Sequence, residues 1–300
     1  MTAIDEIILN FSPGSLTLLN AILAIVMFSI ALDLKLCDFK IFARQPRPIL
    51  TGLVSQFLLL PALTFALIYI TKPQASIALG MILVAACPGG NISNFITHRA
   101  GGNVALSVSL TAFATIGAIF MTPFNVAFWG SLYPPTAEIL EETFIDPISV
   151  AITVGFMLVL PLVLGITLNT KRPDITHKIR RVMQNFSMLI FVAFIVLALA
   201  ANWAYFLNYA ALVAGFVVVH NALALVGGNV IARLARLSPF DRRSITIETG
   251  IQNSGLGLVL IFTFFGGLGG MAVVAAFWGI WHAVSGIALA QWMRRTEVSK

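Results

Sequence analysis

The chain has 300 residues and a formal net charge of +6; 59% of its residues are apolar and only 10% are charged. A soluble protein of this length needs far more charge to cover its surface, so the composition excludes a soluble globular domain. Its apolar runs are about 20 residues long, which excludes the shorter alternating strands of a membrane β-barrel. We therefore expect an all-α polytopic membrane protein.

Hydropathy predicts about nine membrane-spanning helices. In chain order they are expected near Leu16–Leu34, Ile49–Ile70, Ala75–Thr97, Val104–Trp129, Pro147–Leu168, Met183–Phe206, Ala210–Ile231, Ile245–Phe265 and Met271–Met293. The segment Met1–Ser15 has no Lys or Arg and is expected to be a short external segment rather than a signal peptide. Cys37 and Cys87 fall on different spans or their edges, so neither a disulfide framework nor a metal site is expected.

The basic residues lie in alternate connections between these spans. The connections after spans one, three, five and seven, with the C-terminal tail, hold all but one of the 18 Lys and Arg residues, and Lys72 is the exception. Cytoplasmic loops of membrane proteins are rich in Lys and Arg. We therefore predict a protein of the cell membrane with its N-terminus outside and its C-terminus in the cytoplasm. The net charge therefore does not indicate a nucleic-acid partner. The acidic connection 130–146 is expected to be a solvated loop.

The third and eighth spans differ from the others because each is interrupted. The third contains Cys87-Pro-Gly-Gly-Asn-Ile-Ser-Asn94, and the eighth contains Glu248-Thr-Gly-Ile-Gln-Asn-Ser-Gly255. Pro and Gly release backbone groups that must find other partners in a bilayer. A pair of interrupted spans in the two halves of a chain points to the binding site of a transporter. Their odd separation predicts an inverted repeat of spans five to nine and one to four, the latter lacking a leading helix.

Glu248 is the residue of greatest interest, because it is an ionisable group at membrane depth. Such a group costs about 2.5–3.5 kcal/mol on insertion scales and is kept where it lines a cavity or meets an ion. Glu248 and Gln252 are one helical turn apart, and a break near them would leave the carbonyls of Thr249 and Ile251 as free ligands. Oxygen ligands of this kind suit Na⁺ and do not suit zinc or copper.

Ser107 and Thr111 share one helix face and add two hydroxyls to the candidate cation ligands. Alternatively, such hydroxyls only join helices, as a lone His220 or His282 would, and Glu248 is a structural or proton-carrying carboxyl group. The sequence has no HExxH, P-loop, CxxC or convincing nucleophile elbow, so no cofactor other than a cation is expected. An intramembrane Ser/His enzyme stays a remote alternative.

At these motifs the sequence resembles the bile acid:sodium symporter (BASS) family in a nine-helix form. The matching pieces are Cys87–Asn94, Gly102–Val108, Ile247–Leu256 and Trp281-His282. The resemblance implies a core domain with two broken helices that cross at the midplane, over residues 49–129 and 210–293. It also implies a panel domain over residues 16–34 and 147–206.

The resemblance further implies two sodium sites and an adjacent substrate site. One sodium site would consist of Ser93, Asn94, Ser107, Thr111 and Glu248; the second would consist of Gln56, Glu248, Gln252 and the carbonyls of Thr249 and Ile251. The substrate would meet Asn91, Ile92, Asn253 and His282. Asn91 stands where relatives often have Thr or Ser, and Ala283 where they often have Asn.

The sequence therefore predicts a sodium-coupled symporter of an organic anion, such as a bile acid or a small carboxylate, that works by alternating access. The alternative on the same scaffold is a proton-coupled or uncoupled transporter of organic anions. The expected partners are the organic anion, sodium ions and the lipid bilayer.

Overall fold

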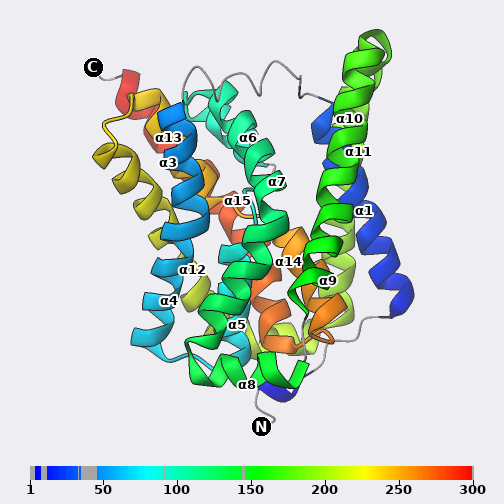
Figure 1. Ribbon diagram of the computed structural model, residues 1–300, viewed down its shortest axis with the longest axis vertical. Coiled ribbons are helices and arrows are strands. Elements are labelled where there is room, and N and C mark those ends of the chain that lie inside the picture. Colours follow the sequence, from blue (N-terminus) through cyan, green and yellow to red (C-terminus); the bar gives the residue numbers. More distant parts are fainter. Residues whose placement is uncertain are drawn as a thin grey trace.

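The computed structural model of the chain, shown in Figure 1, describes residues 4–7, 12–32, 34, 46–90, 92–143 and 146–298. Within these residues the regular structure is helical, apart from one isolated β-bridge. Six stretches are long and apolar enough to cross a membrane: Gly14–Ala31, Pro46–Thr71, Val104–Ser131, Pro147–Lys171, Leu207–Leu234 and Gly269–Arg295. The prediction of an all-α polytopic membrane protein is confirmed, and the count of nine spans stays a prediction. Cys37, Asn91 and the basic stretch 35–45 lie outside the described residues.

The third and eighth predicted spans are each split into two short helices. The third forms α5, Ala75–Ala86, and α6, Ile92–Arg99; the eighth forms α13, Pro239–Gly250, and α14, Ser254–Phe264. The residue after the first helix of each pair is extended, with ψ of 156° and 103° respectively. The prediction that the Pro- and Gly-containing motifs interrupt these two spans is confirmed. The two breaks meet inside the bundle (Figure 1).

The remaining helices surround these four. They are α1 (Pro13–Ala31), α3 (Pro46–Val54), η3 (Ser55–Leu59), α4 (Leu60–Thr71), α7 (Val104–Ser131), α8 (Pro134–Thr143), α9 (Pro147–Val154), η4 (Gly155–Val159), α10 (Leu160–Lys171), α11 (Pro173–Ala201), α12 (Trp203–Leu234) and α15 (Gly269–Val298). In Figure 1, α1, α9, α10 and α11 gather at one side, and α1 packs against α10 and α11. Helices α3, α4, α12 and α13 lie at the other side, with α5, α7, α14 and α15 between.

The broken helices form the buried centre of this bundle. All residues from Ser76 to Ala86 of α5 and from Ser254 to Ile261 of α14 are buried. By contrast, α7 and η4 expose large apolar side chains such as Phe120 and Phe156. Non-helical backbone at membrane depth is tolerated only where protein covers it or water reaches it. The surrounding intact helices therefore make the two breaks possible.

Two of the intact spans contain a π-helical turn just before a proline. Residues Ser55–Leu59 precede Pro61, and residues Gly155–Val159 precede Pro161. Proline has no N–H group and removes one α-helical hydrogen bond, and the wider π-turn accommodates that missing donor. The first of these turns carries Gln56, whose buried side chain reaches the break after α5.

The predicted boundary between the sixth and seventh spans is wrong by several residues. We expected it between Phe206 and Ala210, but α11 ends at Ala201 and α12 begins at Trp203. A single residue, Asn202, makes the turn. The sequence on both sides of Asn202 is apolar, so no polar loop marks the turn in the hydropathy.

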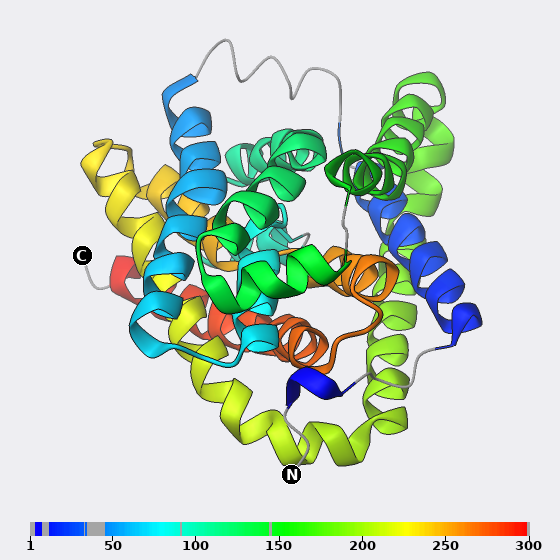
Figure 2. The ribbon, with the colours of Figure 1, turned by 60° about the horizontal axis from the view of Figure 1, so that its bottom comes forward.

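The acidic connection 130–146 contains a helix where we expected a solvated loop. Helix α8 runs across one end of the bundle (Figure 2) and packs against α5 and α7. Its three glutamates are exposed, but Thr136 is buried and donates a hydrogen bond to the carbonyl oxygen of Gly130 at 2.5 Å. Pro134 at the first helical position favours a helix start, because the missing N–H would be unpaired there anyway.

The described part of the N-terminal segment packs at the same end. In η1, Ile4–Glu6, the Asp5 carboxylate accepts a hydrogen bond from the Ser76 N–H at 2.8 Å. The Ile7 carbonyl accepts one from the Gly269 N–H at 2.6 Å. Figure 1 places η1 and the end of α15 at opposite ends of the bundle, as an odd number of spans requires. Which end faces the cytoplasm stays a prediction.

Candidate functional site

The two breaks cross and satisfy one another's backbone groups. Gly89 and Gln252 form an antiparallel bridge. Beside it, the Gly90 N–H donates to the Ile251 carbonyl at 2.7 Å, and the Asn253 N–H donates to the Pro88 carbonyl at 2.9 Å. Each half of the chain thus supplies one donor and one acceptor, as an inverted repeat would. The crossing is a single antiparallel bridge between two extended segments at the centre of a helical protein.

Close approach of the two strands requires glycine at the crossing. A Cβ atom on Gly90 would lie 2.6 Å from the carbonyl oxygen of Gln252, and one on Gly89 would lie 2.5 Å from Glu248 Oε1. Both distances are too short for non-bonded contacts. The Pro-Gly-Gly motif therefore ends α5 and also makes room for the later strand and its carboxylate.

Side-chain amides cap the helix ends that the crossing leaves open. Gln56 Nε2 donates to the Cys87 carbonyl at 2.8 Å, just after α5. Asn221 Nδ2 donates to the Gly250 carbonyl at 2.7 Å, at the end of α13. Because the last carbonyls of a helix lack partners within it, both bonds satisfy otherwise orphaned acceptors. Each amide comes from the intact span that directly precedes the broken span to which it bonds.

Glu248 lies beside this crossing with its carboxylate buried, since the residue is only 4% exposed. Ser107 Oγ donates to Glu248 Oε2 at 2.9 Å, and Thr111 Oγ1 donates to Oε1 at 2.6 Å. The two hydroxyls come from one face of α7, as their spacing predicted. The structure therefore brings three of the five predicted ligands of the first sodium site into direct contact.

The other two predicted ligands of that set lie on the first turn of α6. Asn94 Oδ1 lies 2.9 Å from Ser107 Oγ and 3.5 Å from Thr111 Oγ1. Ser93 is fully buried near Glu248, but its hydroxyl makes no well-formed hydrogen bond to a described residue. All five side chains of the predicted set therefore converge on one place.

Each of the two hydroxyls that reach Glu248 has more than one acceptor oxygen nearby. Each hydroxyl has one proton, yet Ser107 Oγ lies within hydrogen-bonding distance of both Glu248 Oε2 and Asn94 Oδ1. Thr111 Oγ1 likewise approaches Glu248 Oε1 and the Ser107 carbonyl, the latter at 3.0 Å. No ion pair to Glu248 exists among the described residues. A buried carboxylate without a positive partner is costly, and a small hard cation would complete this oxygen set.

The residues of the second predicted sodium site form hydrogen bonds with one another. Gln56 Nε2 donates to Gln252 Oε1 at 2.6 Å, and Gln252 Nε2 donates to the Thr249 carbonyl at 2.7 Å. The Ile251 carbonyl accepts the bond from Gly90 described above. The expectation that the carbonyls of Thr249 and Ile251 are left free is therefore wrong, because the crossing and the Gln252 side chain supply partners. A carbonyl oxygen has two lone pairs, so their role as ion ligands stays a prediction.

The predicted substrate contacts lie around the crossing with different roles. Asn91 lies outside the described residues, and Ile92 is the partly buried first residue of α6. Asn253 caps α14, because its Oδ1 accepts the Leu256 N–H at 3.1 Å. His282 is buried on α15, between two glycines of that helix that approach Ser254 and Ile251. His282 therefore lies on the face of α15 that packs against the break.

Several residues that complete the site were missed by the sequence analysis. Thr97 Oγ1 donates to Ser107 Oγ at 3.3 Å, and the Ser55 and Thr249 hydroxyls lie 2.8 Å apart. Thr97 lies one helical turn after Ser93, and this spacing was the available signal. His220 bonds a neighbouring helix, as the alternative for it proposed, because its Nε2 lies 2.6 Å from Thr64 Oγ1.

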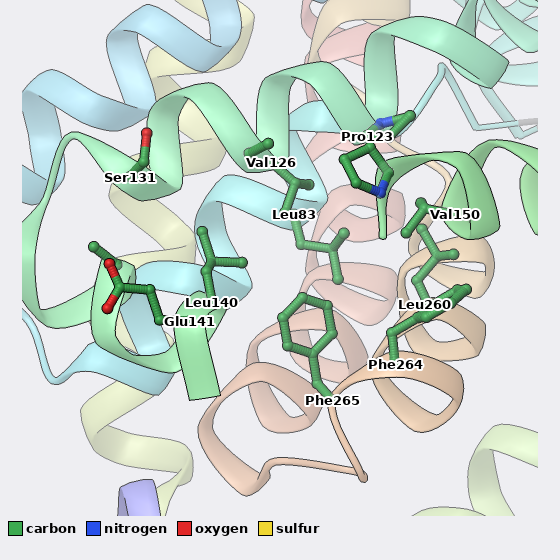
Figure 3. Close-up of a pocket in the computed structure, with 13 residues that line it drawn as sticks. Leu83, Pro123, Val126, Ser131, Leu140, Glu141, Val150, Leu260, Phe264 and Phe265 are labelled. Carbon is green, nitrogen blue, oxygen red and sulfur yellow. The ribbon is translucent and has the colours of Figure 1, made fainter. Parts of the chain in front are cut away.

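A cavity of about 250 Å³ lies beside α8, among α5, α7, α9 and α14. Figure 3 shows its lining: Val150 of α9 lies on the same side as Leu260 and Phe264 of α14, Leu140 and Glu141 of α8 lie on the opposite side, and Leu83 of α5 lies between them. The lining is apolar except for Ser131 and Glu141. The cavity lies where helices grouped with α1 meet the central helices, at the end of the molecule that carries α8.

Comparison with known proteins gives one consistent family. The model of the Sodium Bile acid symporter family matches residues 20–209. The chain is 30% identical to "Uncharacterized sodium-dependent transporter YocS" of Bacillus subtilis, over 97% of this chain and 89% of that protein. It is 33% identical to "Probable sodium/metabolite cotransporter BASS2, chloroplastic" of Oryza sativa, over 79% of this chain and 55% of that protein. It is 29% identical to "Sodium-dependent organic anion transporter" of Mus musculus, over 95% and 76% respectively.

Proposed function

This chain belongs to the sodium bile acid symporter family, which is a family of transporters and not of enzymes, and we propose that it carries an organic anion across a membrane together with sodium. The observation that best supports this proposal is the buried Glu248 carboxylate, which has hydroxyl and amide oxygens around it and no positive partner among the described residues. The names of the relatives support sodium coupling.

The first sodium ion would be held by Glu248 with Ser107, Thr111, Asn94 and Ser93. When bound, sodium supplies the positive charge that the buried carboxylate lacks. The ligands come from α6 and α13, which belong to the two different broken spans, and from α7. An ion that bridges these helices would hold the two broken spans in one arrangement, and this is how ion binding would prepare the substrate site.

A second sodium ion would require rearrangement at Gln56 and Gln252. Their amides bond to one another at 2.6 Å, and the Gln252 amide also holds the Thr249 carbonyl. Rotation of the two amides would turn their oxygens toward Glu248 and release that carbonyl. We therefore propose that the first site is formed in this arrangement and that the second forms only after the glutamine pair opens.

The organic anion would bind beside the crossing, at Asn91, Ile92, Asn253 and His282. Helices α6 and α14 begin there, and helix N-termini favour negative charge. Helices of the core domain, residues 49–129 and 210–293, would then move against the panel domain, residues 16–34 and 147–206. The N-terminus would lie outside and the C-terminus in the cytoplasm. Sodium drives this cycle only if it binds one state more tightly than the other.

Uptake by purified protein in proteoliposomes tests the proposal. Radiolabelled carboxylates, including a bile acid, are supplied outside with an inward gradient of Na⁺ or of K⁺ at constant pH. We expect uptake of at least one anion with Na⁺ and little with K⁺. Equal uptake with both cations would contradict sodium coupling.

The proton-coupled alternative is favoured by one feature of the same site. A protonated Glu248 would be neutral, and its hydroxyl neighbours can accept as well as donate hydrogen bonds. A pH gradient imposed without Na⁺ separates the alternatives. Uptake that follows this gradient and ignores Na⁺ would select proton coupling.

A further inference from the structure

Asn221 of α12 joins two helices at the break after α13. Its Nδ2 donates to the Gly250 carbonyl at 2.7 Å, and its Oδ1 accepts a hydrogen bond from Ser285 Oγ of α15 at 2.6 Å. Asn221 is only 1% exposed, so water does not compete for these bonds. A buried side chain that uses both ends of its amide in this way is held in one orientation.

The place that Asn221 holds has a counterpart in the other half of the molecule. Gly250 precedes Ile251, whose carbonyl takes part in the crossing, and Cys87 likewise precedes Pro88. Gln56 donates to the Cys87 carbonyl at 2.8 Å as Asn221 donates to that of Gly250. Each half of the chain therefore uses an amide from the preceding intact span to fix the carbonyl where its broken span begins to cross.

The Gly250 peptide needs an external partner more than most. Glycine permits more backbone conformations than any other residue. In addition, the last carbonyl oxygens of a helix have no N–H donor within the helix. Leu225 of α12 fills the space that a Cβ atom on Gly250 would occupy. A residue with a side chain, whose backbone would be less flexible, therefore does not fit at this position. Asn221 is the residue whose hydrogen bond fixes the direction of this peptide.

That peptide lies close in sequence to every ligand that α13 contributes. Glu248 and Thr249 immediately precede Gly250, and Ile251 follows it. We propose that Asn221 is a positioning residue for the cation site: it holds the end of α13 so that the Glu248 carboxylate stays over Ser107 and Thr111. Asn221 bonds to Gly250 and Ser285 and not to the carboxylate or to those hydroxyls, so it acts through the backbone. The inference rests on the proposed sodium coupling.

The test is the sodium dependence of uptake in proteoliposomes for the wild type and Asn221→Leu. Leucine has a similar volume and cannot donate or accept. We expect the sodium concentration for half-maximal uptake to rise about tenfold, which corresponds to about 1.4 kcal/mol. The maximal rate at saturating sodium should stay within about twofold of wild type, since an ion at high concentration restores the arrangement by mass action. A residue with a merely structural role would lower the amount of active protein, and hence the maximal rate, without this shift.

Asn229→Leu is the matched control. Asn229 lies on the same helix, and its amide also bonds to α13, but it bonds to the Thr246 hydroxyl at 3.2 Å, away from the break. We expect its sodium dependence to equal that of the wild type. Ser285→Ala provides a second, milder variant, which removes only the bond that orients Asn221; a shift in the same direction of about threefold is expected.

The possible results separate the inference from the proposed function. Wild-type sodium dependence in both Asn221→Leu and Ser285→Ala would overturn the inference alone, as would an equal shift in Asn229→Leu. If Asn221→Leu does not fold, Ser285→Ala decides, and its unchanged sodium dependence is the contradicting result. Wild-type uptake that ignores sodium would overturn the proposed function and the inference with it.

Discussion

The two sets of oxygens that flank the crossing differ in how they are bonded. Around Glu248, two hydroxyls and an amide oxygen surround one carboxylate and leave it without a positive partner. Around Gln252, the amides of two glutamines bond to each other, and the available carbonyl already has a donor. The first set lacks positive charge, whereas the second is complete in itself. This difference is the reason for our proposal that the first set binds a cation in this arrangement and that the second does not.

Replacement of Glu248 by Gln is expected to have the largest effect. Glutamine keeps the shape and removes the charge, so the first set loses its need for a cation. Removing one partner of a buried charge pair costs about 3–5 kcal/mol, which is more than a hundredfold in affinity. We expect sodium-dependent uptake to vanish while the protein still folds. Normal uptake by a well-folded Glu248→Gln protein would place the ion elsewhere.

Substitution at the crossing should disturb both sets at once. In Gly90→Ala the added methyl would meet the Gln252 carbonyl oxygen at 2.6 Å, and both strands are too constrained to move freely. Overpacking of this kind costs about 1–3 kcal/mol or more. We expect a lower melting temperature and uptake reduced at least about tenfold.

Gly257→Ala is the control for Gly90→Ala. Gly257 is buried on α14, and its nearest neighbours would lie 3.9 Å from an added Cβ. This variant should melt and transport as the wild type does. If both variants behave alike, close approach of the strands is not what the glycine at position 90 provides.

A single hydroxyl of the first set should matter less than the carboxylate. In Thr111→Val the bond to Glu248 Oε1 is lost while the shape is kept. We expect the sodium concentration for half-maximal uptake to rise about tenfold, as for a hydrogen bond to a charged group. Thr115 is one turn further along the same helix and donates only to the Thr111 carbonyl, at 2.7 Å. Thr115→Val should therefore leave the sodium dependence close to that of the wild type.

Loss of the hydrogen bond between Gln56 and Gln252 should have the smallest effect on binding of the first sodium ion. In Gln252→Leu, Gln56 loses one partner but keeps the Cys87 carbonyl. We expect half-maximal uptake at a sodium concentration within about threefold of the wild-type value, and a Hill coefficient for sodium that falls from about two toward one. A Hill coefficient of one in the wild type would instead show that the second set never opens to hold sodium.

The sequence was most informative where one residue type has one dominant effect. Pro88 and the two glycines after it predicted the first break, because those residues cannot continue a membrane helix without leaving backbone groups unpaired. Glu248 stood out for the same kind of reason. Helix periodicity then put Ser107 and Thr111 on one face, and the structure places that face against the carboxylate.

The sequence was least informative where orientation and long-range contact decide. The family resemblance placed Gln56 and Gln252 in one site, but nothing in the chain indicates that their amides bond to each other, or that Asn221 reaches Gly250, because each pair is remote in sequence. The turn at Asn202 was misplaced because one residue suffices for it and its neighbours are apolar. The sidedness of the protein and the division into core and panel stay predictions.

Direct binding of sodium to the purified protein tests the central claim without the need to know the anion. Radioactive ²²Na⁺ binding is measured for the wild type and for Glu248→Gln at equal amounts of folded protein, with excess K⁺ as competitor. We predict saturable binding by the wild type that K⁺ does not displace, and none above background for Glu248→Gln. Equal sodium binding by the two proteins would contradict the account.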